Sequence, residues 1–161
     1  MKIIIIIISL FFVSSCGQTK DDTFTLDPSK PIEVGIESIG GDSQEVQIIN
    51  VYMINHQPVS GIQFKIEPDT FFNVDSVFGG RCQANDFQLH SNDKGTILGF
   101  SMSGASIPES KNLNKKDNIL FSIKAKLKQE INAPITLSPI IASSSAKRIE
   151  CISIPFELIG K

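Results

Sequence analysis

The sequence predicts an all-β fold, a sandwich of two sheets with about nine strands. No window of the 161 residues keeps a helical spacing of apolar residues. Short segments with apolar side chains at every second position instead recur at intervals of roughly a dozen residues, separated by turn-forming Gly, Pro, Asn and Asp. The long polar gaps suit connections that cross between sheets, so we expect a two-sheet sandwich and not a closed barrel.

The segment 95–108, GTILGFSMSGASIP, carries a strong strand signal followed by a corner. Leu98, Phe100 and Met102 alternate with small residues, and this period of two is expected when one strand face is buried. We therefore expect these three side chains to face the core. The serines of the segment have no neighbouring base, so it is a scaffold element.

The other strands follow from the same alternation. Residues 45–55 change phase near Ile49, which indicates a β-bulge or burial on both faces. Residues 79–86 are expected to form a loop, and Pro139 and Pro155 favour edge positions or bulges. The expected strands are 32–38, 45–55, 59–67, 71–78, 87–90, 95–103, 119–128, 135–142 and 149–159.

The N-terminus predicts export. Met1 and Lys2 precede the apolar run 3–13, which as a helix is about 16 Å long and so too short for a hydrocarbon core of about 30 Å. We expect residues 1–15 to be a secretory signal peptide. We expect residues 16–31 to form a flexible tether and residues 32–161 to form one folded domain.

The tetrapeptide Val-Ser-Ser-Cys that ends at Cys16 resembles the lipobox of bacterial lipoproteins. The resemblance implies acylation of Cys16, palmitate included, and anchoring in the bacterial outer membrane. An ordinary signal peptide with an incidental cysteine is the alternative. Lys20-Asp21-Asp22 resembles the surface-export signal of Bacteroidetes lipoproteins, which implies the cell surface; a solvated tether is the other interpretation.

Composition argues against two classes of function. Without residues 1–15 the chain has 14 basic and 17 acidic residues, and the basic residues form no cluster of the kind that binds nucleic acid. The sequence has no G-x-S-x-G motif, and its two histidines have no partner that would make a nucleophile. We expect a protein that is not an enzyme and needs no cofactor.

The two cysteines beyond Cys16 suggest a disulfide. Exported chains are exposed to oxidising conditions, so Cys82 and Cys151 are expected to pair, with two separate thiols as the alternative. No metal site is predicted, because the chain has no CxxC and its histidines lack ligand spacing. Oxygen donors for calcium are conceivable at Asn85, Asp86, Asn92 and Asp93, which turn formation explains equally well.

Two stretches together resemble a known family. Residues 59–66, VSGIQFKI, and residues 97–108, ILGFSMSGASIP, are followed by a strand that contains Leu120-Phe121. This pattern is similar to the cohesin-like domains of bacterial surface proteins, over about residues 32–159. The resemblance implies a nine-stranded jelly-roll sandwich of the superfamily that includes cellulose-binding modules, with a protein or carbohydrate ligand on an exposed sheet face. It also implies that Phe64 and Phe100 fill the space between the sheets.

The chain departs from that family's setting in two ways. It carries no dockerin-like calcium repeat, so a role in a cellulosome is not expected. It has no Trp and one Tyr, Tyr52, so it lacks the flat aromatic strip with which cellulose modules stack on sugars.

The combined evidence predicts a lipid-anchored, non-catalytic binding module of the envelope or cell surface, with a protein or glycan partner. The alternative is a structural or assembly lipoprotein that joins an outer-membrane complex through a sheet edge. A carrier of small apolar ligands would require a closed barrel with an empty interior. Ligand contacts are expected on exposed polar groups beside a rigid sheet, namely Gln63, Lys65, Glu67, Arg81 and Asp86.

Overall fold

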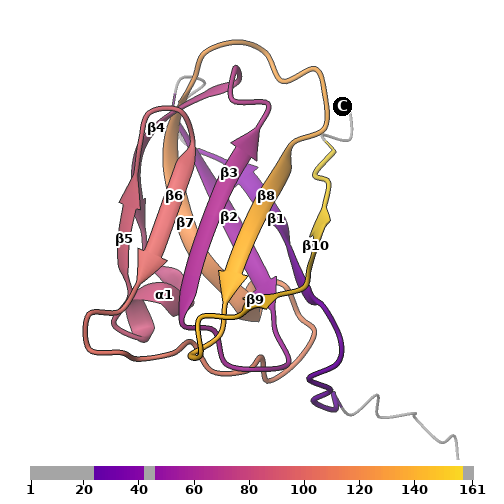
Figure 1. The fold of residues 1–161 in the computed structure, drawn as a ribbon. Coiled ribbons are helices and arrows are strands. Elements are labelled where there is room, and N and C mark those ends of the chain that lie inside the picture. Colours follow the sequence, from indigo (N-terminus) through magenta and orange to yellow (C-terminus); the bar gives the residue numbers. More distant parts are fainter. Residues whose placement is uncertain (1–23, 42–45, 158–161) are drawn as a thin grey trace, which may run out of the picture.

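The computed structural model describes residues 24–41 and 46–157, and they form two stacked β-sheets (Figure 1). One five-stranded sheet has the order β10-β1-β2-β7-β4, and we call it the β1 sheet. The other has the order β5-β6-β3-β8-β9, and we call it the β3 sheet. Neighbouring strands are antiparallel except β1 and β10, which are parallel. The predicted all-β, two-sheet sandwich is confirmed.

The strands match the predicted segments closely, with one exception. The predicted strand 149–159 divides at Glu150: Ile149 pairs with Ile141 in the β3 sheet, whereas Cys151 pairs with Ile32 in the β1 sheet. This change of sheet gives ten strands instead of about nine. They are β1 (Ile32–Gly40), β2 (Val46–Ile54), β3 (Gly61–Glu67), β4 (Phe72–Phe78), β5 (Gln88–Ser91), β6 (Thr96–Phe100), β7 (Ile119–Leu127), β8 (Thr136–Ala142), β9 (Arg148–Ile149) and β10 (Cys151–Ile154).

The core lies between the two sheets and is filled by side chains. Phe64 of β3 meets Phe121 of β7 edge to face, with ring centroids 5.4 Å apart. Ile123 and Ala125 continue the buried stripe of β7, as their alternation predicts. Because the sheets have open edges and a packed interior, the described residues do not form the hollow barrel that a carrier of apolar ligands requires.

Strand β2 shows both features that its phase change predicted. The β2–β7 register shifts between Val51 and Tyr52, and four consecutive residues, 51–54, are buried. Tyr52 lies on the outer side of the β1 sheet, where Lys115 covers its ring at 4.8 Å and its hydroxyl donates to Glu33 Oε1 at 2.7 Å. A loop therefore buries the second face of the strand.

The predicted phase of β6 is wrong. Leu98 and Phe100 are 43% and 40% exposed, and Met102, just beyond the strand, is 75% exposed, whereas Ile97 is fully buried. Gly99 faces inward with Ile97, and Ile62 fills the space above it: a Cβ at Gly99 would lie 2.7 Å from Ile62 Cγ1. The alternation was correct, but a glycine occupies a core position and leaves the larger apolar residues outside.

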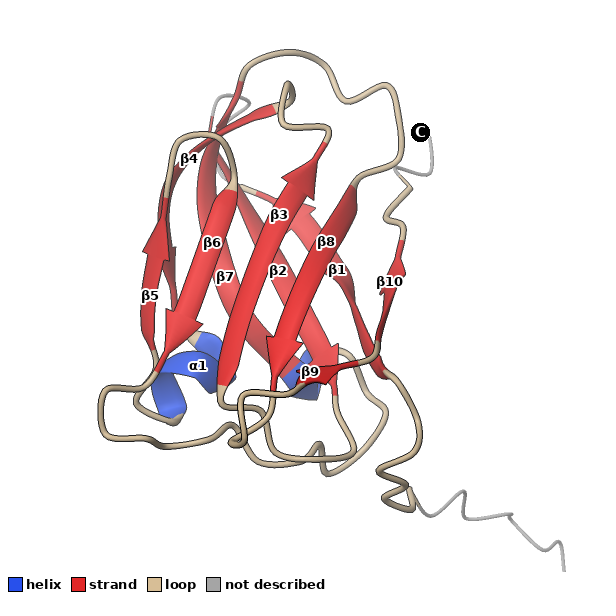
Figure 2. Cartoon of the chain, in the orientation of Figure 1, coloured by secondary structure: helices blue, strands red, loops and turns tan. Residues whose placement is uncertain are grey.

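Residues 79–86 are not simply a loop, because they include a short helix, α1 (Gly80–Ala84). Gly79 and Gly80 have φ of 75° and 62°, a region that glycine adopts without strain, and they redirect the chain into the helix. The helix closes the lower end of the sandwich in Figure 2. The long connection from β6 to β7, residues 101–118, crosses between the sheets at this same end and contains the 3₁₀ helix η1 (Lys116–Asn118).

Residues 24–31 lie against the folded body before β1 begins at Ile32. The ring of Phe24 packs 5.2 Å from that of His56, and the Asp27 N–H donates to His56 Nδ1 at 3.2 Å. The expected signal peptide, Cys16 and Lys20-Asp21-Asp22 lie outside the described residues. Within the part that the structure describes, no helix has the length and apolarity that a membrane crossing requires.

Candidate binding surface

The outer face of the β3 sheet presents an exposed group of apolar and polar side chains. In antiparallel sheets, directly paired residues point to the same face. Gln63 of β3 pairs with Leu98 of β6 on one side and with Ile140 of β8 on the other, and Leu98 also pairs with His90 of β5. Phe100 lies two residues from Leu98 and shares its face. We call the set His90, Leu98, Phe100, Gln63 and Ile140 the β3-sheet patch.

The apolar members of the patch are accessible. Ile140 is 45% exposed, close to the values of Leu98 and Phe100. His90 stacks on Phe100 with ring centroids 5.7 Å apart and an angle of 20° between the rings. Gly61 of β3 pairs with Phe100, so no side chain stands opposite Phe100 on that neighbouring strand. The patch is therefore a rigid, partly aromatic surface on four hydrogen-bonded strands.

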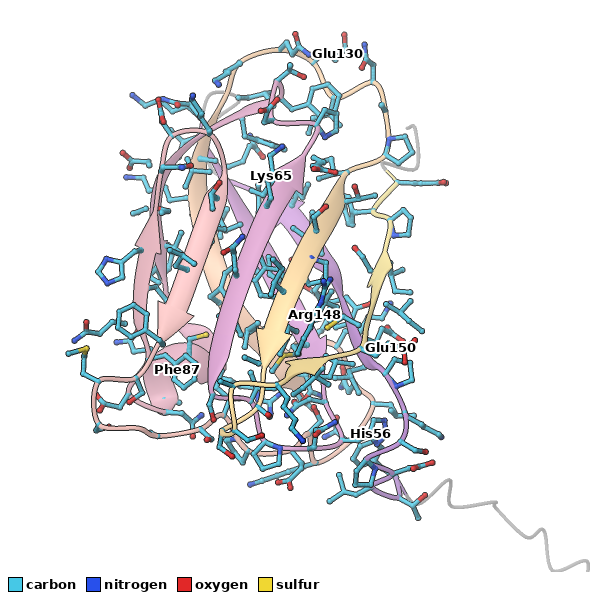
Figure 3. The ribbon with its side chains drawn as sticks, viewed as in Figure 1. His56, Lys65, Phe87, Glu130, Arg148 and Glu150 are labelled. Carbon is cyan, nitrogen blue, oxygen red and sulfur yellow. The ribbon has the colours of Figure 1, made fainter. Side chains whose placement is uncertain are left out.

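The predicted ligand residues of β3 lie on this same face. Gln63 is in the middle of the patch, while Lys65 and Glu67 continue the row beyond it. Lys65 Nζ lies 3.5 Å from Glu67 Oε1, and both side chains are nearly half exposed. Figure 3 shows Lys65 on the outward side of β3. Lys65 and Glu67 form a polar margin to the patch, and Gln63 is a polar group within it.

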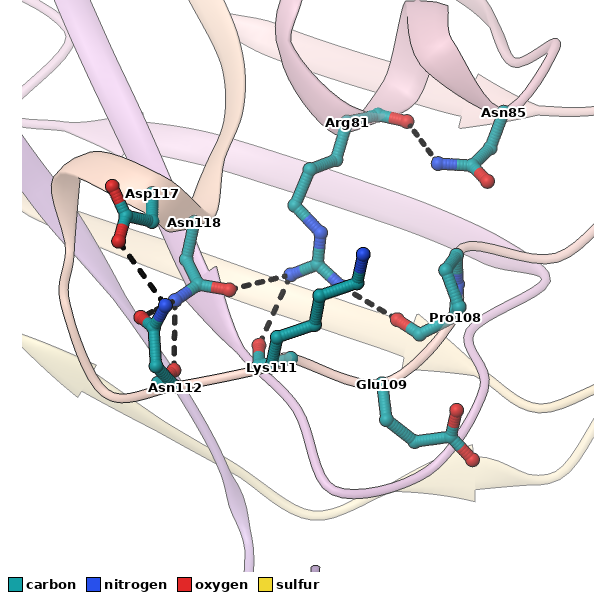
Figure 4. A pocket seen from close by; sticks show the side chains of 9 residues that line it. Arg81, Asn85, Pro108, Glu109, Lys111, Asn112, Asp117 and Asn118 are labelled. Carbon is teal, nitrogen blue, oxygen red and sulfur yellow. Dashed lines mark hydrogen bonds between the residues drawn. The ribbon is translucent and has the colours of Figure 1, made fainter. Parts of the chain in front are cut away.

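Arg81 lies elsewhere, at the α1 end of the sandwich (Figure 4). Its Nη1 donates to Met53 O at 2.9 Å, to Ser110 Oγ at 3.1 Å and to Asn118 Oδ1 at 3.3 Å, and its Nη2 donates to Pro108 O. Burial lowers the pKa of the guanidinium from its usual value. Arg81 thus ties the 101–118 loop to the end of β2, which gives it a structural role beside any role in binding.

Asp86 makes no hydrogen bond or ion pair with Arg81, and it lies outside the strands that carry the patch. Its backbone has φ of 59°, and its Oδ2 accepts a hydrogen bond of 2.7 Å from Ser103 Oγ. This bond joins the turn after α1 to the corner that follows β6. The structure therefore brings together Gln63, Lys65 and Glu67 but not all five predicted ligand residues.

The conceivable calcium ligands do not converge. Asn85 and Asp86 precede β5, whereas Asn92 and Asp93 follow it, so roughly 20 Å of extended chain separates the two pairs. The Asn92 side chain accepts the backbone N–H groups of Lys94 and Thr96, which is ordinary turn formation. Among the described residues, no group of three or more His, Cys, Asp or Glu is arranged to hold a metal.

The expected disulfide is absent: Cys82 and Cys151 are both free thiols. Cys82 lies on α1, which packs against β7, and Cys151 lies on β10, three strands from β7 in the β1 sheet. Three strand spacings are about 14 Å, whereas bridged cysteines require Cα atoms within about 7 Å of each other. Burial raises the pKa of Cys82 to about 12 and that of Cys151 to about 11, so both are poor nucleophiles.

The sequence analysis expected Leu98 and Phe100 in the core, because they follow the alternation of a buried stripe. The alternation by itself does not show which stripe of β6 faces inward. The signal that could have shown it was Ile97, a β-branched residue on the opposite stripe. Ile140 follows Pro139, and strand pattern alone did not identify its face.

Three solved structures have similar folds. A chain of the CaDoc0917–CaCohA2 complex has a TM-score of 0.51 at 16% identity, and the match spans 76% of this chain and 95% of that one. For a non-cellulosomal cohesin from Archaeoglobus fulgidus the TM-score is 0.53 at 14% identity, and the match spans 81% of this chain and 93% of that one. For the third ScaB cohesin of R. flavefaciens, in complex with a group 1 dockerin, the TM-score is 0.51 at 10% identity, and the match spans 76% of this chain and 90% of that one.

No family model and no curated protein matches the sequence. At these identities the structural likeness concerns the fold. The chain adopts a cohesin-like jelly-roll sandwich.

Proposed function

We propose that this chain is a non-catalytic protein-binding module and that the β3-sheet patch is its contact surface. The observation that carries the proposal is the placement of Leu98 and Phe100 on one side of Gln63 and of Ile140 on the other, all on the exposed face of a rigid sheet. Large apolar side chains gathered on an exposed face are typical of interaction sites. Lys65 and Glu67 supply polar groups at the margin, as in protein interfaces with a polar rim.

A protein partner fits the patch better than a glycan. Sugar-binding surfaces stack rings on flat aromatic side chains, but the chain has no Trp, and Tyr52 is buried beneath Lys115. Phe100 and His90 form one small aromatic pair, and aliphatic Leu98 and Ile140 occupy the rest. Two of the similar structures are protein complexes, one of them a cohesin with a group 1 dockerin, which supports a protein partner in general.

The module is also proposed to be anchored in a bacterial outer membrane through acylated Cys16, facing the cell surface. The lipobox resemblance and the apolar run 3–13 support this placement. Metabolic labelling with an alkyne palmitate should mark the wild-type protein and leave Cys16→Ser unmarked. Labelling of the Cys16→Ser variant would contradict the anchor, and full protection from protease on intact cells would contradict the surface location.

The binding surface is tested by capture from envelope extract, identification by mass spectrometry, and titration with the purified partner. Phe100→Asp should weaken the titrated binding by at least tenfold, because a charge would enter an apolar contact. Phe78→Asp is the matched control, since Phe78 is 45% exposed on β4 of the other sheet. Equal loss in both variants would contradict the assignment of the surface.

Two other outcomes would replace the proposal. A glycan-array signal that Phe100→Asp abolishes would show a carbohydrate-binding face. Stoichiometric recovery with one outer-membrane complex, insensitive to Phe100→Asp but lost on changes at the β5 edge, would favour the assembly lipoprotein.

A further inference from the structure

A second candidate site lies at the α1 end of the sandwich, apart from the β3-sheet patch. A cavity of about 330 Å³ opens between α1 and the 101–118 loop. This volume is at the lower end of the range for small-molecule sites. Its lining includes Arg81 and Asn85 on the helix side and Glu109, Lys111, Asn112, Asp117 and Asn118 on the loop side.

Arg81 presents free hydrogen-bond donors to this cavity. Its four hydrogen bonds use Nη1 and one N–H of Nη2, so Nε–H and the second Nη2 N–H have no partner among the described residues. Nε is accessible, because no buried side-chain nitrogen or oxygen in the described part of the chain lacks a partner. Nε–H and the remaining N–H of Nη2 are therefore the donors that Arg81 can offer to a carboxylate, a group that guanidinium binds well.

The positive charge of Arg81 is not neutralised by the protein. The ion pairs of the described residues are Lys65–Glu67 and Lys124–Asp75, so no carboxylate lies within 4.0 Å of Arg81 or Lys111. Figure 4 shows the Lys111 side chain extending toward Arg81 and the Glu109 carboxylate directed away from it. The fourth charged residue of the lining, Asp117, instead accepts a hydrogen bond from Asn112 Nδ2 at 3.1 Å.

The cavity is rigid where the charges meet. Asn118 Nδ2 donates to Asn112 O at 2.9 Å and to Asn114 O at 2.8 Å, and Asn85 Nδ2 donates to Arg81 O at 2.7 Å. These bonds hold both walls of the cavity in place, so a ligand would meet a preformed site around Arg81.

We propose that this cavity binds a carboxylate group of a protein partner, either the end of a chain or an Asp or Glu side chain. The carboxylate would accept from Nε and Nη2 of Arg81 and receive the charge of Lys111. The amide groups that line the cavity offer donors and acceptors to the adjoining peptide unit. The inference that the ligand is a carboxylate depends on the cavity alone. The inference that a peptide carries this carboxylate rests on the proposed protein-binding function.

Nuclear magnetic resonance of the full mature chain tests the proposal with three probes. They are N-acetyl-Ala-Ala as the free acid, the same dipeptide as its C-terminal amide, and N-acetyl-Asp-amide, all at matched ionic strength. We expect saturable shifts of the Arg81 Nε–H signal with a carboxylate probe and none with the dipeptide amide. A shift with the free acid but not with N-acetyl-Asp-amide would identify the carboxylate as a chain terminus. A shift with N-acetyl-Asp-amide but not with the free acid would identify it as a side chain.

Lys111→Met keeps the test independent of folding, because Lys111 is exposed and makes no hydrogen bond or ion pair with the described residues. The variant should bind the active probe about two- to fivefold more weakly. Lys126→Met, at an exposed position of β7, is the matched control and should bind like the wild type. Arg81→Lys has no guanidinium Nε–H to observe, so probe binding to this variant is followed by the backbone N–H signal of Asn112. That signal should shift saturably in the wild type and show no saturable shift in Arg81→Lys.

Three results would overturn the proposal: no saturable shift with either carboxylate probe, equal shifts with acid and amide, or equal weakening by Lys111→Met and Lys126→Met. Tighter binding of glucuronate than of either peptide would overturn the peptide source. None of these results depends on the β3-sheet patch, whose failure would appear separately as unchanged partner binding by Phe100→Asp.

Discussion

Truncation of two adjacent residues in β6 tests which face of that strand lies in the core. Ile97 is fully buried and Leu98 is 43% exposed, so Ile97→Ala and Leu98→Ala remove equal numbers of carbon atoms from opposite sides of the sheet. The proposed function depends on this difference, because Leu98 is free for a partner only if Ile97 is the residue that packs inside.

The size of the effect follows from the burial. Ile97→Ala removes three buried carbon groups, which contribute about 0.8 kcal/mol each, and the cavity left behind brings the expected loss in the free energy of unfolding to about 3 to 4 kcal/mol. Leu98→Ala removes groups that are only half covered, so we expect a loss of about 1 kcal/mol.

Urea unfolding of the purified protein measures both values. With a slope of about 1 to 3 kcal/mol per molar urea, Ile97→Ala should lower the midpoint by more than about 1 M and Leu98→Ala by much less. A larger loss of stability in Leu98→Ala than in Ile97→Ala would mean that Leu98 is the residue that faces the core. The basis of the β3-sheet patch would then be removed.

Three further predictions follow from the packing. Gly99→Val should destabilise the protein by about 1 to 3 kcal/mol in urea unfolding, because the new Cβ would lie 2.7 Å from Ile62 Cγ1. Gly61→Ala should be tolerated, since its Cβ would lie 3.7 Å from that of Ala142. Equal losses of stability in the two variants would argue against this packing. The pKa of Cys82 is raised by burial to about 12, so the folded state favours the neutral thiol and stability should decline as pH rises from about 9 toward 12. Cys82→Ala should flatten that decline, and Cys151→Ala should flatten it less, since the pKa of Cys151 is raised only to about 11; no flattening in Cys82→Ala would contradict the assignment. Phe24→Ala should make residues 24–31 more susceptible to limited proteolysis and leave the urea midpoint of unfolding unchanged. An unchanged cleavage rate would show that the Phe24–His56 contact does not hold this segment against the domain.

The class of fold and most strand positions could be predicted from the sequence alone. In β7 the apolar residues Phe121, Ile123 and Ala125 alternate with polar residues that include lysines, which predicts one buried and one solvent-exposed face. This prediction does not depend on which strands lie beside β7. The polar side of β3, with Gln63, Lys65 and Glu67, was found for the same reason. Local periodicity is a property of the chain and is visible before any strand is paired.

The inward side of β6 is set by tertiary packing, because its two stripes are Ile97 with Gly99 and Leu98 with Phe100, and both contain apolar residues. The pairing of Ile97 with buried Phe64 and the packing of Ile62 over Gly99 leave Leu98 and Phe100 on the exposed face. The separation of Cys82 from Cys151 likewise depends on strand order, which spacing along the chain does not contain. The cavity beside Arg81 exists because a loop of eighteen positions, 101–118, folds back onto a short helix, and such long-range contacts are set by the whole sandwich.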